Sequence, residues 1–199
     1  MADNSQKILT LKYFIQNRRS VYPVAFNEEP VDDSIINEML EAANWAPTHR
    51  LTQPWRFSVF AEEGLKKLAD FQSELYKRLS TDRGDFKEKT YQKLKSKPLN
   101  CSHVIAIGMK RDPKESVPEV EEIISVASAV QNMWLTASAY KVGCYWSTGG
   151  ITYENEALKF FGLDKNDKLL GFLFIGNTDK KWPQSRRSPI TEKVEWIKN

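Results

Sequence analysis

The sequence predicts a small sheet of about four strands covered by helices, in an α+β or α/β arrangement. Two short apolar runs, at 103–109 and 168–176, are typical of buried strands. A long segment at 119–141 is apolar over most of a helical circumference, so it must be covered on several sides. Helical patterns separate these runs from two further candidate strands, and such alternation indicates a sheet with helices packed on it.

The chain opens with a predicted helix over residues 5–17. Its apolar positions recur at helical spacing on one face: Ile8, Leu11, Phe14 and Ile15. An Arg-Arg-Ser sequence at 18–20 follows directly, and Pro23 shows that the helix has stopped by then.

A second helix and a first strand are predicted next. Asp32 or Asp33 can cap the free backbone N–H groups of the helix, and Pro47 ends it. The apolar side chains of its buried stripe are Ile35, Ile36, Met39, Leu40 and Ala43. Residues 55–60 alternate as a strand, with Trp55, Phe57 and Val59 facing one way.

A third helix is predicted at 62–79, and a strongly polar segment follows at 82–97. This segment has few apolar anchors and cannot bury much surface. It is therefore either a mobile flap over a site or the solvated face of a helix, and the residues favour neither interpretation.

The second half of the chain predicts the rest of the sheet. Gly143 is expected to close the long helix, as C-terminal glycines do. Residues 144–148 indicate a strand, and 155–161 a short helix. The tail at 177–199 is too poor in apolar residues to fold alone, so its apolar side chains are expected to dock on a partner subunit.

Length and composition favour one globular domain over residues 1–199. Apolar residues make up 41% of the chain and the net charge is +3, which is too small to predict nucleic-acid binding. The beginning of the sequence lacks the pattern of a secretory signal, and no apolar run reaches the roughly 20 residues that span a bilayer. We therefore expect a cytoplasmic protein that binds neither membranes nor nucleic acid.

The chain has two cysteines, Cys101 and Cys144, and two histidines, His49 and His103. They lack the spacing of a zinc site, so no metal is expected. Free buried thiols are the simplest interpretation, and they fit a reducing compartment.

Several catalytic motifs are missing from the sequence. It contains no GxGxxG, no GxxxxGK[ST] and no GxSxG, and no paired carboxylates lie at helical spacing beside an apolar wall. An enzyme with this sequence would take its chemistry from a cofactor.

Four separated segments together resemble the nitroreductase family. They are RRS at 18–20, AANWAPTHRLTQPWRF at 42–57, QNMWLTASAYKVGCYWSTGG at 131–150 and WPQSRRSPITEKVEWI at 182–197. Their order and spacing match over nearly the whole chain, and they are most similar to the compact branch of the family. The usual asparagine four residues after the Ala-Pro pair is Leu51 here, so that flavin contact is not carried over.

The resemblance implies an α+β fold with three layers, α/β/α, around a mostly antiparallel sheet, with a domain-swapped C-terminal tail. It also implies flavin mononucleotide (FMN) as cofactor, NADH or NADPH as co-substrate, and a homodimer with shared active sites. The reaction would be ping-pong, with hydride passing to the flavin and then to a small acceptor such as a nitroaromatic, a quinone or an activated alkene. In this scheme the flavin carries the chemistry, and His49 is a possible proton donor beside water.

The residue types suit a flavin phosphate. A dianionic phosphate needs guanidinium groups and a hydroxyl, which Arg18, Arg19 and Ser20 offer in one stretch. Arg186 or Arg187 of the tail could close on the same group. The alternative is that adjacent arginines only flank a helix C-terminus, where the helix dipole favours cations.

The flavin ring needs flat apolar support and a few directed hydrogen bonds. Candidates follow the strand at 144–148, where backbone N–H groups could reach the ring: Trp146, Ser147, Thr148 and Gly149. Further candidates lie in or beside a proline-bounded loop that the resemblance assigns largely to the other subunit: Trp45, His49 and Gln53.

Three further hypotheses stay open on the sequence alone. The basic residues between 76 and 97 could attract the extra phosphate of NADPH. The chain could be a flavin carrier or sensor without catalysis. It could also be a flavin-free dimeric interaction protein, which the departure at Leu51 favours and the arginine-rich segments oppose.

Overall fold

Four antiparallel strands form one sheet in the order β1-β2-β4-β3. The computed structural model describes residues 4–198, so the last residue of the predicted tail and residues 1–3 lie outside it. The strands are β1 (Trp55–Ala61), β2 (His103–Met109), β3 (Gly143–Ser147) and β4 (Lys168–Gly176). The predicted sheet is confirmed, within a residue or two at each boundary.

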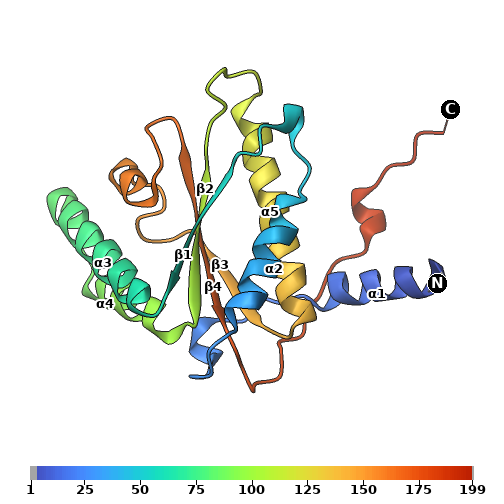
Figure 1. Ribbon diagram of the computed structural model, residues 1–199, viewed down its shortest axis with the longest axis horizontal. Coiled ribbons are helices and arrows are strands. Elements are labelled where there is room, and N and C mark those ends of the chain that lie inside the picture. The colour runs from blue at the N-terminus through green and yellow to red at the C-terminus, as the bar shows by residue number, and fades with distance from the viewer. Residues whose placement is uncertain (1–3, 199) are drawn as a thin grey trace.

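Helices cover both faces of this sheet, so the predicted three layers are confirmed (Figure 1). One layer consists of α2 (Asp33–Asn44) and α5 (Glu119–Ala139), and the other of α3 (Glu63–Arg83) and α4 (Glu88–Ser96). Every residue of β2 is buried because β2 is an inner strand with a helical layer on each face. The fold is therefore α+β.

The predicted start of α2 is confirmed, and its end comes earlier than expected. The Asp32 carboxylate accepts a hydrogen bond from the Ser34 backbone N–H, which caps the helix. The helix ends at Asn44, and Trp45 forms the C-cap, two residues before Pro47.

The prediction that Gly143 closes α5 is wrong. Tyr140 is the C-cap residue, and Lys141 takes the left-handed conformation, with a φ of 59°. Gly143 instead begins β3, where a Cβ atom would lie 2.9 Å from the ring of Phe26 and 3.1 Å from the Gly176 carbonyl oxygen. The glycine is needed for close packing rather than for the helix end.

The polar segment at 82–97 is mostly helical. Helix α3 continues to Arg83 and ends at Gly84, whose φ is 74°. Helix α4 then packs back on α3: the Gln72 amide donates to the Leu94 carbonyl at 2.6 Å, and the Tyr91 hydroxyl donates to Glu74 at 2.7 Å. These contacts support the helical interpretation over the mobile flap.

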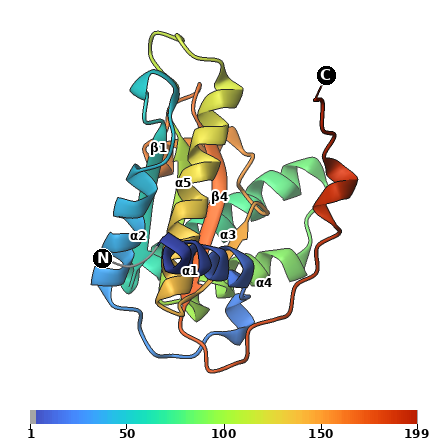
Figure 2. The same cartoon turned by 90° about the vertical axis from the view of Figure 1, so that its right-hand side faces the viewer.

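Helix α1 (Asn4–Asn17) and the C-terminal tail extend from the body on one side (Figures 1 and 2). No residue of α1 is buried, and only Phe14 of its predicted apolar face is half-buried. The tail is similarly exposed, including Trp196 at 80%. Within the described part of the chain, no helix has the length and apolar character needed to cross a membrane.

Short 3₁₀ turns complete the structure. The predicted short helix at 155–161 is one of them, over Asn155–Phe161. The others are Pro23–Ala25, His49–Leu51, Pro98–Asn100 and Ile190–Lys193.

Candidate functional site

Arg18 is half-buried at the end of α1 and has an unsatisfied donor. Its guanidinium carbon lies 4.4 Å from the centroid of the Trp134 ring, and its Nη1 is buried and has no hydrogen-bond partner among residues 4–198. Burial, followed by the charges of Arg187 and Arg19, holds the pKa of Arg18 below its usual value. A buried cation crowded by other cations and missing an acceptor is expected where an anion binds.

The tail contacts the Arg-Arg-Ser segment through Pro183. The Arg19 Nε donates to the Pro183 carbonyl at 2.9 Å. A small cavity of about 220 Å³ is lined by Arg19 and Arg187, together with Ile15, Gln16 and Ser185. Arg187 is the tail arginine whose charge lowers the pKa of Arg18, and the side chains of Arg186 and Arg187 are both exposed.

Ser20 joins this segment to the edge of the sheet. It forms an isolated parallel bridge with Cys144 of β3, and the Val21 N–H donates to the Cys144 carbonyl at 2.9 Å. Two residues further on, the rings of Tyr22 and Tyr145 lie 4.4 Å apart. The Arg-Arg-Ser segment therefore runs beside β3, which is an edge strand.

A cavity of about 220 Å³ lies at the other end of β3. Ser147, Gly149 and Gly150 line it from the loop after the strand, and Lys93 and Lys97 line it from α4 and its end. Its remaining lining residues come from α3, α4 and β4: Gln72, Thr90, Leu94, Phe172 and Phe174. The cavity thus combines an aromatic floor with two ammonium groups.

Lys97 is the most perturbed cation of this cavity. Its ammonium lies 3.8 Å from the centroid of Phe174 and 4.8 Å from that of Tyr145. Burial, and to a lesser extent the charge of Lys93, lowers the pKa of Lys97 to about 8. In the sequence Lys97 is only one of the basic residues at 76–97 that could attract the extra phosphate of NADPH, and no local signal marks it as the cation of this cavity.

The loop after β3 is fixed by close packing. The Trp146 indole donates to the Leu170 carbonyl at 3.0 Å, so this tryptophan is held against β4. Thr148 and Gly149 are exposed. A Cβ at Gly150 would lie 2.6 Å from a methyl group of Leu94, so the loop abuts α4.

The loop between α2 and β1 carries the remaining predicted residues. His49 Nδ1 lies 2.5 Å from a carboxylate oxygen of Glu121, and Trp45 is 80% exposed. Arg50, Leu51 and Gln53 have φ values of 52°, 54° and 44°. Three non-glycine residues in this disfavoured region mark a strained loop, and such strain often accompanies function.

This loop and the arginine segment do not meet within one chain. His49 contacts Glu121 near the start of α5, whereas Arg18 contacts Trp134 thirteen residues along the same helix. At 1.5 Å per residue these points are about 20 Å apart. The structure places the Arg-Arg-Ser segment at the start of β3 and Ser147 and Gly149 at its other end. It leaves the loop of His49 away from Arg18.

The three-layer fold is shared with solved structures of nitroreductase-like proteins. The crystal structure of a nitroreductase-like family protein from Bacillus cereus superimposes with a TM-score of 0.78 at 29% identity, covering 95% of this chain and 96% of that one. The FMN-dependent nitroreductase NfnB from Mycobacterium smegmatis, solved with NADPH, shares the fold with a TM-score of 0.70 at 17% identity, covering 96% and 99%.

Sequence comparison gives the same classification. YfhC of Bacillus subtilis (strain 168), named as a candidate NAD(P)H nitroreductase, is 29% identical over 92% of each chain. The model of the nitroreductase family matches residues 15–177. The chain belongs to the nitroreductase family.

Proposed function

We propose that this chain binds FMN along β3 and passes electrons from a reduced nicotinamide to a small oxidised acceptor. The chain is an NAD(P)H-dependent flavin oxidoreductase, in line with its family. The observation that carries the FMN site is the buried, unpaired Nη1 of Arg18 beside Arg187, with the Lys97 cavity at the far end of the same strand.

The phosphate is assigned to the Arg-Arg-Ser end of β3. Arg18 supplies the unsatisfied guanidinium, and Ser20 supplies a hydroxyl. Arg19 already holds the tail through Pro183, and Arg187 or Arg186 completes the set from the tail. An anion at this point offsets the mutual repulsion of these cations.

The flavin ring is assigned to the Lys97 cavity. When bound, FMN supplies hydride chemistry that side chains cannot perform. The exposed residues Thr148 and Gly149, with the half-buried Ser147, would offer backbone N–H donors, and the Trp146 indole is held against β4 by the Leu170 carbonyl. Lys97 lies where a cation favours negative charge on the ring.

The other wall of the site is assigned to a second copy of the chain. The loop that carries His49 and Gln53, with Trp45 beside it, lies about 20 Å along α5 from the phosphate end. A homodimer would place the partner's loop over the ring and give the exposed apolar side chains of α1 and the tail a surface to cover. We propose that the tail beyond the Arg-Arg pair is exchanged between the two copies.

The reaction order proposed is ping-pong, with the nicotinamide and the acceptor using the same open face in turn. Nitroaromatics, quinones and activated alkenes all fit a site whose work is to position flat electrophiles. The proton comes from water or from His49, which Glu121 holds by its Nδ1. One FMN-binding domain over residues 1–199 and a cytoplasmic location stay predictions.

The proposed function is tested by a visible spectrum of the purified protein, before and after NADH or NADPH is added without oxygen. We expect a flavin spectrum that bleaches with a nicotinamide and returns when a quinone is added. A yellow protein that does not bleach would be a flavin carrier, and a colourless protein that cannot take up FMN would refute the flavin site.

Removing the charge of Lys97 is expected to make the flavin harder to reduce. Lys97→Met should lower the midpoint potential at pH 7 by roughly 40 mV, since losing a charge-assisted contact costs about 2 kcal/mol on a two-electron couple. Because the pKa of Lys97 is about 8, its charge is present below that pH and lost above it. The difference from the unmodified protein should therefore shrink as pH rises past 9.

The matched control is Lys93→Met, which removes an exposed lysine from the same cavity. The midpoint potential of Lys93→Met should change by less than half of the shift expected for Lys97→Met. Potentials that are equal for Lys97→Met and the unmodified protein at pH 7 would contradict the placement of the ring.

Charges on the exposed face of α1 are expected to break the dimer. The unmodified protein should sediment at twice its 23.0 kDa mass. Leu11 and Ile15 are more than half exposed within one chain, and the proposed dimer would cover them. The double variant Leu11→Asp/Ile15→Asp should therefore be monomeric at micromolar concentration and retain less FMN. Lys12→Asp on the same helix should remain dimeric. A flavin-saturated monomer of the unmodified protein would refute the shared site.

A further inference from the structure

Trp134 of α5 contacts both arginines of the Arg-Arg-Ser segment. Its indole N–H donates to the Arg19 carbonyl at 3.1 Å, and its ring centroid lies 4.4 Å from the Arg18 guanidinium carbon. The two contacts use different parts of the indole, the nitrogen and the face of the ring. Neither the sequence motifs nor the proposed flavin contacts give this side chain a role.

The indole ring holds the Arg18 side chain without using up its hydrogen-bond donors. A cation is attracted to the face of an aromatic ring by the ring quadrupole, so this contact needs no hydrogen-bond acceptor. The Arg18 Nη1 is accordingly buried and yet has no partner among residues 4–198. An aliphatic side chain at position 134 would leave the buried charge uncompensated, and a carboxylate would occupy the donor. An aromatic ring is therefore the residue type that fixes Arg18 and keeps it available to an anion.

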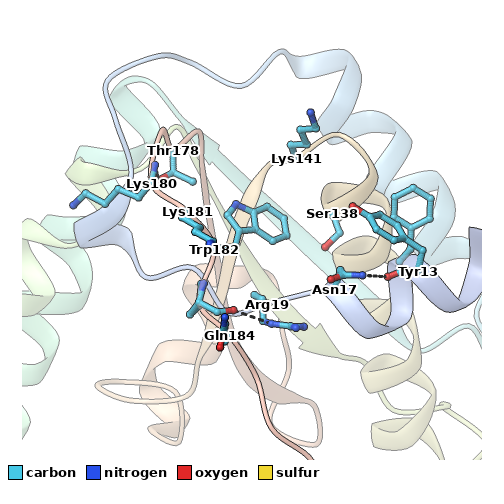
Figure 3. A pocket seen from close by; sticks show the side chains of 12 residues that line it. Tyr13, Asn17, Arg19, Ser138, Lys141, Thr178, Lys180, Lys181, Trp182 and Gln184 are labelled. Carbon is cyan, nitrogen blue, oxygen red and sulfur yellow. Dashed lines mark hydrogen bonds between the residues drawn. The ribbon is translucent and has the colours of Figure 1, made fainter.

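The neighbouring Arg19 is already engaged within the chain. Its Nη1 donates to the Gln16 carbonyl at 2.6 Å, and its Nε donates to the Pro183 carbonyl at 2.9 Å. Figure 3 shows the Arg19 side chain beside the tail, with a hydrogen bond to it drawn as a dashed line. The two adjacent arginines therefore differ: Arg19 joins the end of α1 to the tail, and Arg18 keeps a free donor.

The indole N–H of Trp134 fixes the peptide unit between Arg19 and Ser20. The Arg19 carbonyl and the Ser20 N–H belong to one planar trans unit and point in opposite directions. A hydrogen bond to this carbonyl therefore sets the direction of the Ser20 N–H and the place where the Ser20 side chain starts. Ser20 in turn forms the bridge to Cys144 of β3.

Trp134 is mounted on a rigid part of the fold. It is half-buried and packs against the core formed by α2, α5 and the sheet. Two residues earlier in α5, the Asn132 amide donates to the Ala42 carbonyl at 3.1 Å and so ties this helix to α2. A side chain held in this way by packing is suited to orienting its neighbours.

We infer that Trp134 is a positioning residue of the phosphate site, and that it makes the site select a phosphorylated flavin over the same ring without a phosphate. The inference rests on the proposed function, because the groups that Trp134 orients are those assigned to the FMN phosphate. The ring face keeps Arg18 in place with a free donor, and the indole N–H orients the Ser20 peptide. Both contacts lie at the Arg-Arg-Ser end of β3, away from the cavity assigned to the flavin ring.

The test compares FMN with riboflavin, which has the same ring and no phosphate, on the full chain freed of flavin. Dissociation constants are measured by flavin fluorescence. Trp134→Leu removes both contacts and should weaken FMN binding about tenfold, whereas Trp134→Phe keeps a ring face and should weaken it about threefold. Riboflavin binding should change by less than about twofold in both variants. The matched control is Trp55→Phe, which removes an indole N–H that donates to Asn44 and should leave the binding of both flavins unchanged.

A double-mutant cycle with Arg18→Ala separates positioning from general stability. In the Arg18→Ala background, Trp134→Leu should weaken FMN binding by less than about threefold, because its main partner is gone. Equal losses in both backgrounds, or equal losses for FMN and riboflavin, would show a merely structural tryptophan and overturn the inference. Trp134→Phe gives the same comparison if Trp134→Leu is too unstable to purify. If Arg18→Ala weakens FMN binding and both Trp134 variants bind FMN normally, only this inference fails; a protein that takes up no FMN would refute the proposed function as well.

Discussion

Replacing Arg18 with alanine is expected to weaken FMN binding by about 2 kcal/mol or more, roughly 30-fold. The guanidinium is half-buried, its Nη1 has no partner, and the charges of Arg187 and Arg19 act on it. A bound phosphate would offset the burial of the charge, accept a hydrogen bond from Nη1 and reduce the repulsion between the arginines. In Arg18→Ala the phosphate would lose the guanidinium group that is best placed to bind it. The dissociation constant is measured by fluorescence quenching of FMN added to flavin-free protein.

The same substitution should hardly affect the flavin-free fold. The substitution removes a cation–π contact between Arg18 and Trp134, worth about 0.5–1 kcal/mol. It also removes the cost of burying the Arg18 charge and the repulsion of that charge by Arg187 and Arg19. The free energy of unfolding, measured in urea, should therefore change by less than about 1 kcal/mol. Arg78→Ala, which removes an exposed arginine paired with Glu156, should leave FMN affinity unchanged. Unchanged FMN affinity in Arg18→Ala would show that the phosphate binds elsewhere.

Gly171→Ala is expected to destabilise the protein by about 3 kcal/mol or more. Gly171 has a φ of 118°, and a Cβ would lie 2.5 Å from the Ser147 carbonyl oxygen and 2.8 Å from the Trp146 indole nitrogen. Backbone strain costs about 1–3 kcal/mol, and the overlap with a backbone oxygen adds to it. The register between β2 and β4 shifts at this point, so the glycine forms part of a bulge in β4. Urea unfolding of flavin-free protein measures the loss.

Gly84→Ala separates the two causes. Gly84 also has a positive φ, 74°, but nothing lies within 4 Å of the Cβ position. It should cost about 1 kcal/mol, from the backbone alone. If both variants unfold at the same urea concentration, the glycine at 171 is required by its backbone conformation alone and not by the close approach of β4 to the end of β3.

Local patterns were enough to predict most of the elements. The bounds of β2 and β4 are as predicted, because a short continuous apolar run between polar ends is typical of a buried strand. The capping carboxylate at Asp32 fixed the start of α2 for the same local reason. The end of α5 was mispredicted because a glycine near a helix end can serve the helix or the next strand, and only the position of Phe26 decides between them.

Half of the candidate site could also be predicted. Arg18, Arg19 and Ser20 are adjacent in the sequence, and the charge of the tail residue Arg187 acts on Arg18 in the structure. That these residues bind a phosphate stays a prediction. Lys97 could not be found this way. It is one of many lysines in its segment, and it differs from them only because the fold buries it against Phe174 and Tyr145.

The sequence by itself therefore determined the strands, most of the helices and the family, because these depend on short-range periodicity and on motifs read in order. The tertiary structure decided which cations are buried, which glycines are needed for close approach, and that the loop of His49 lies far from Arg18 along α5. Those properties arise from contacts between residues that are distant in the chain, and burial, which changes a side chain's charge and hydrogen bonding, exists only once the layers have packed.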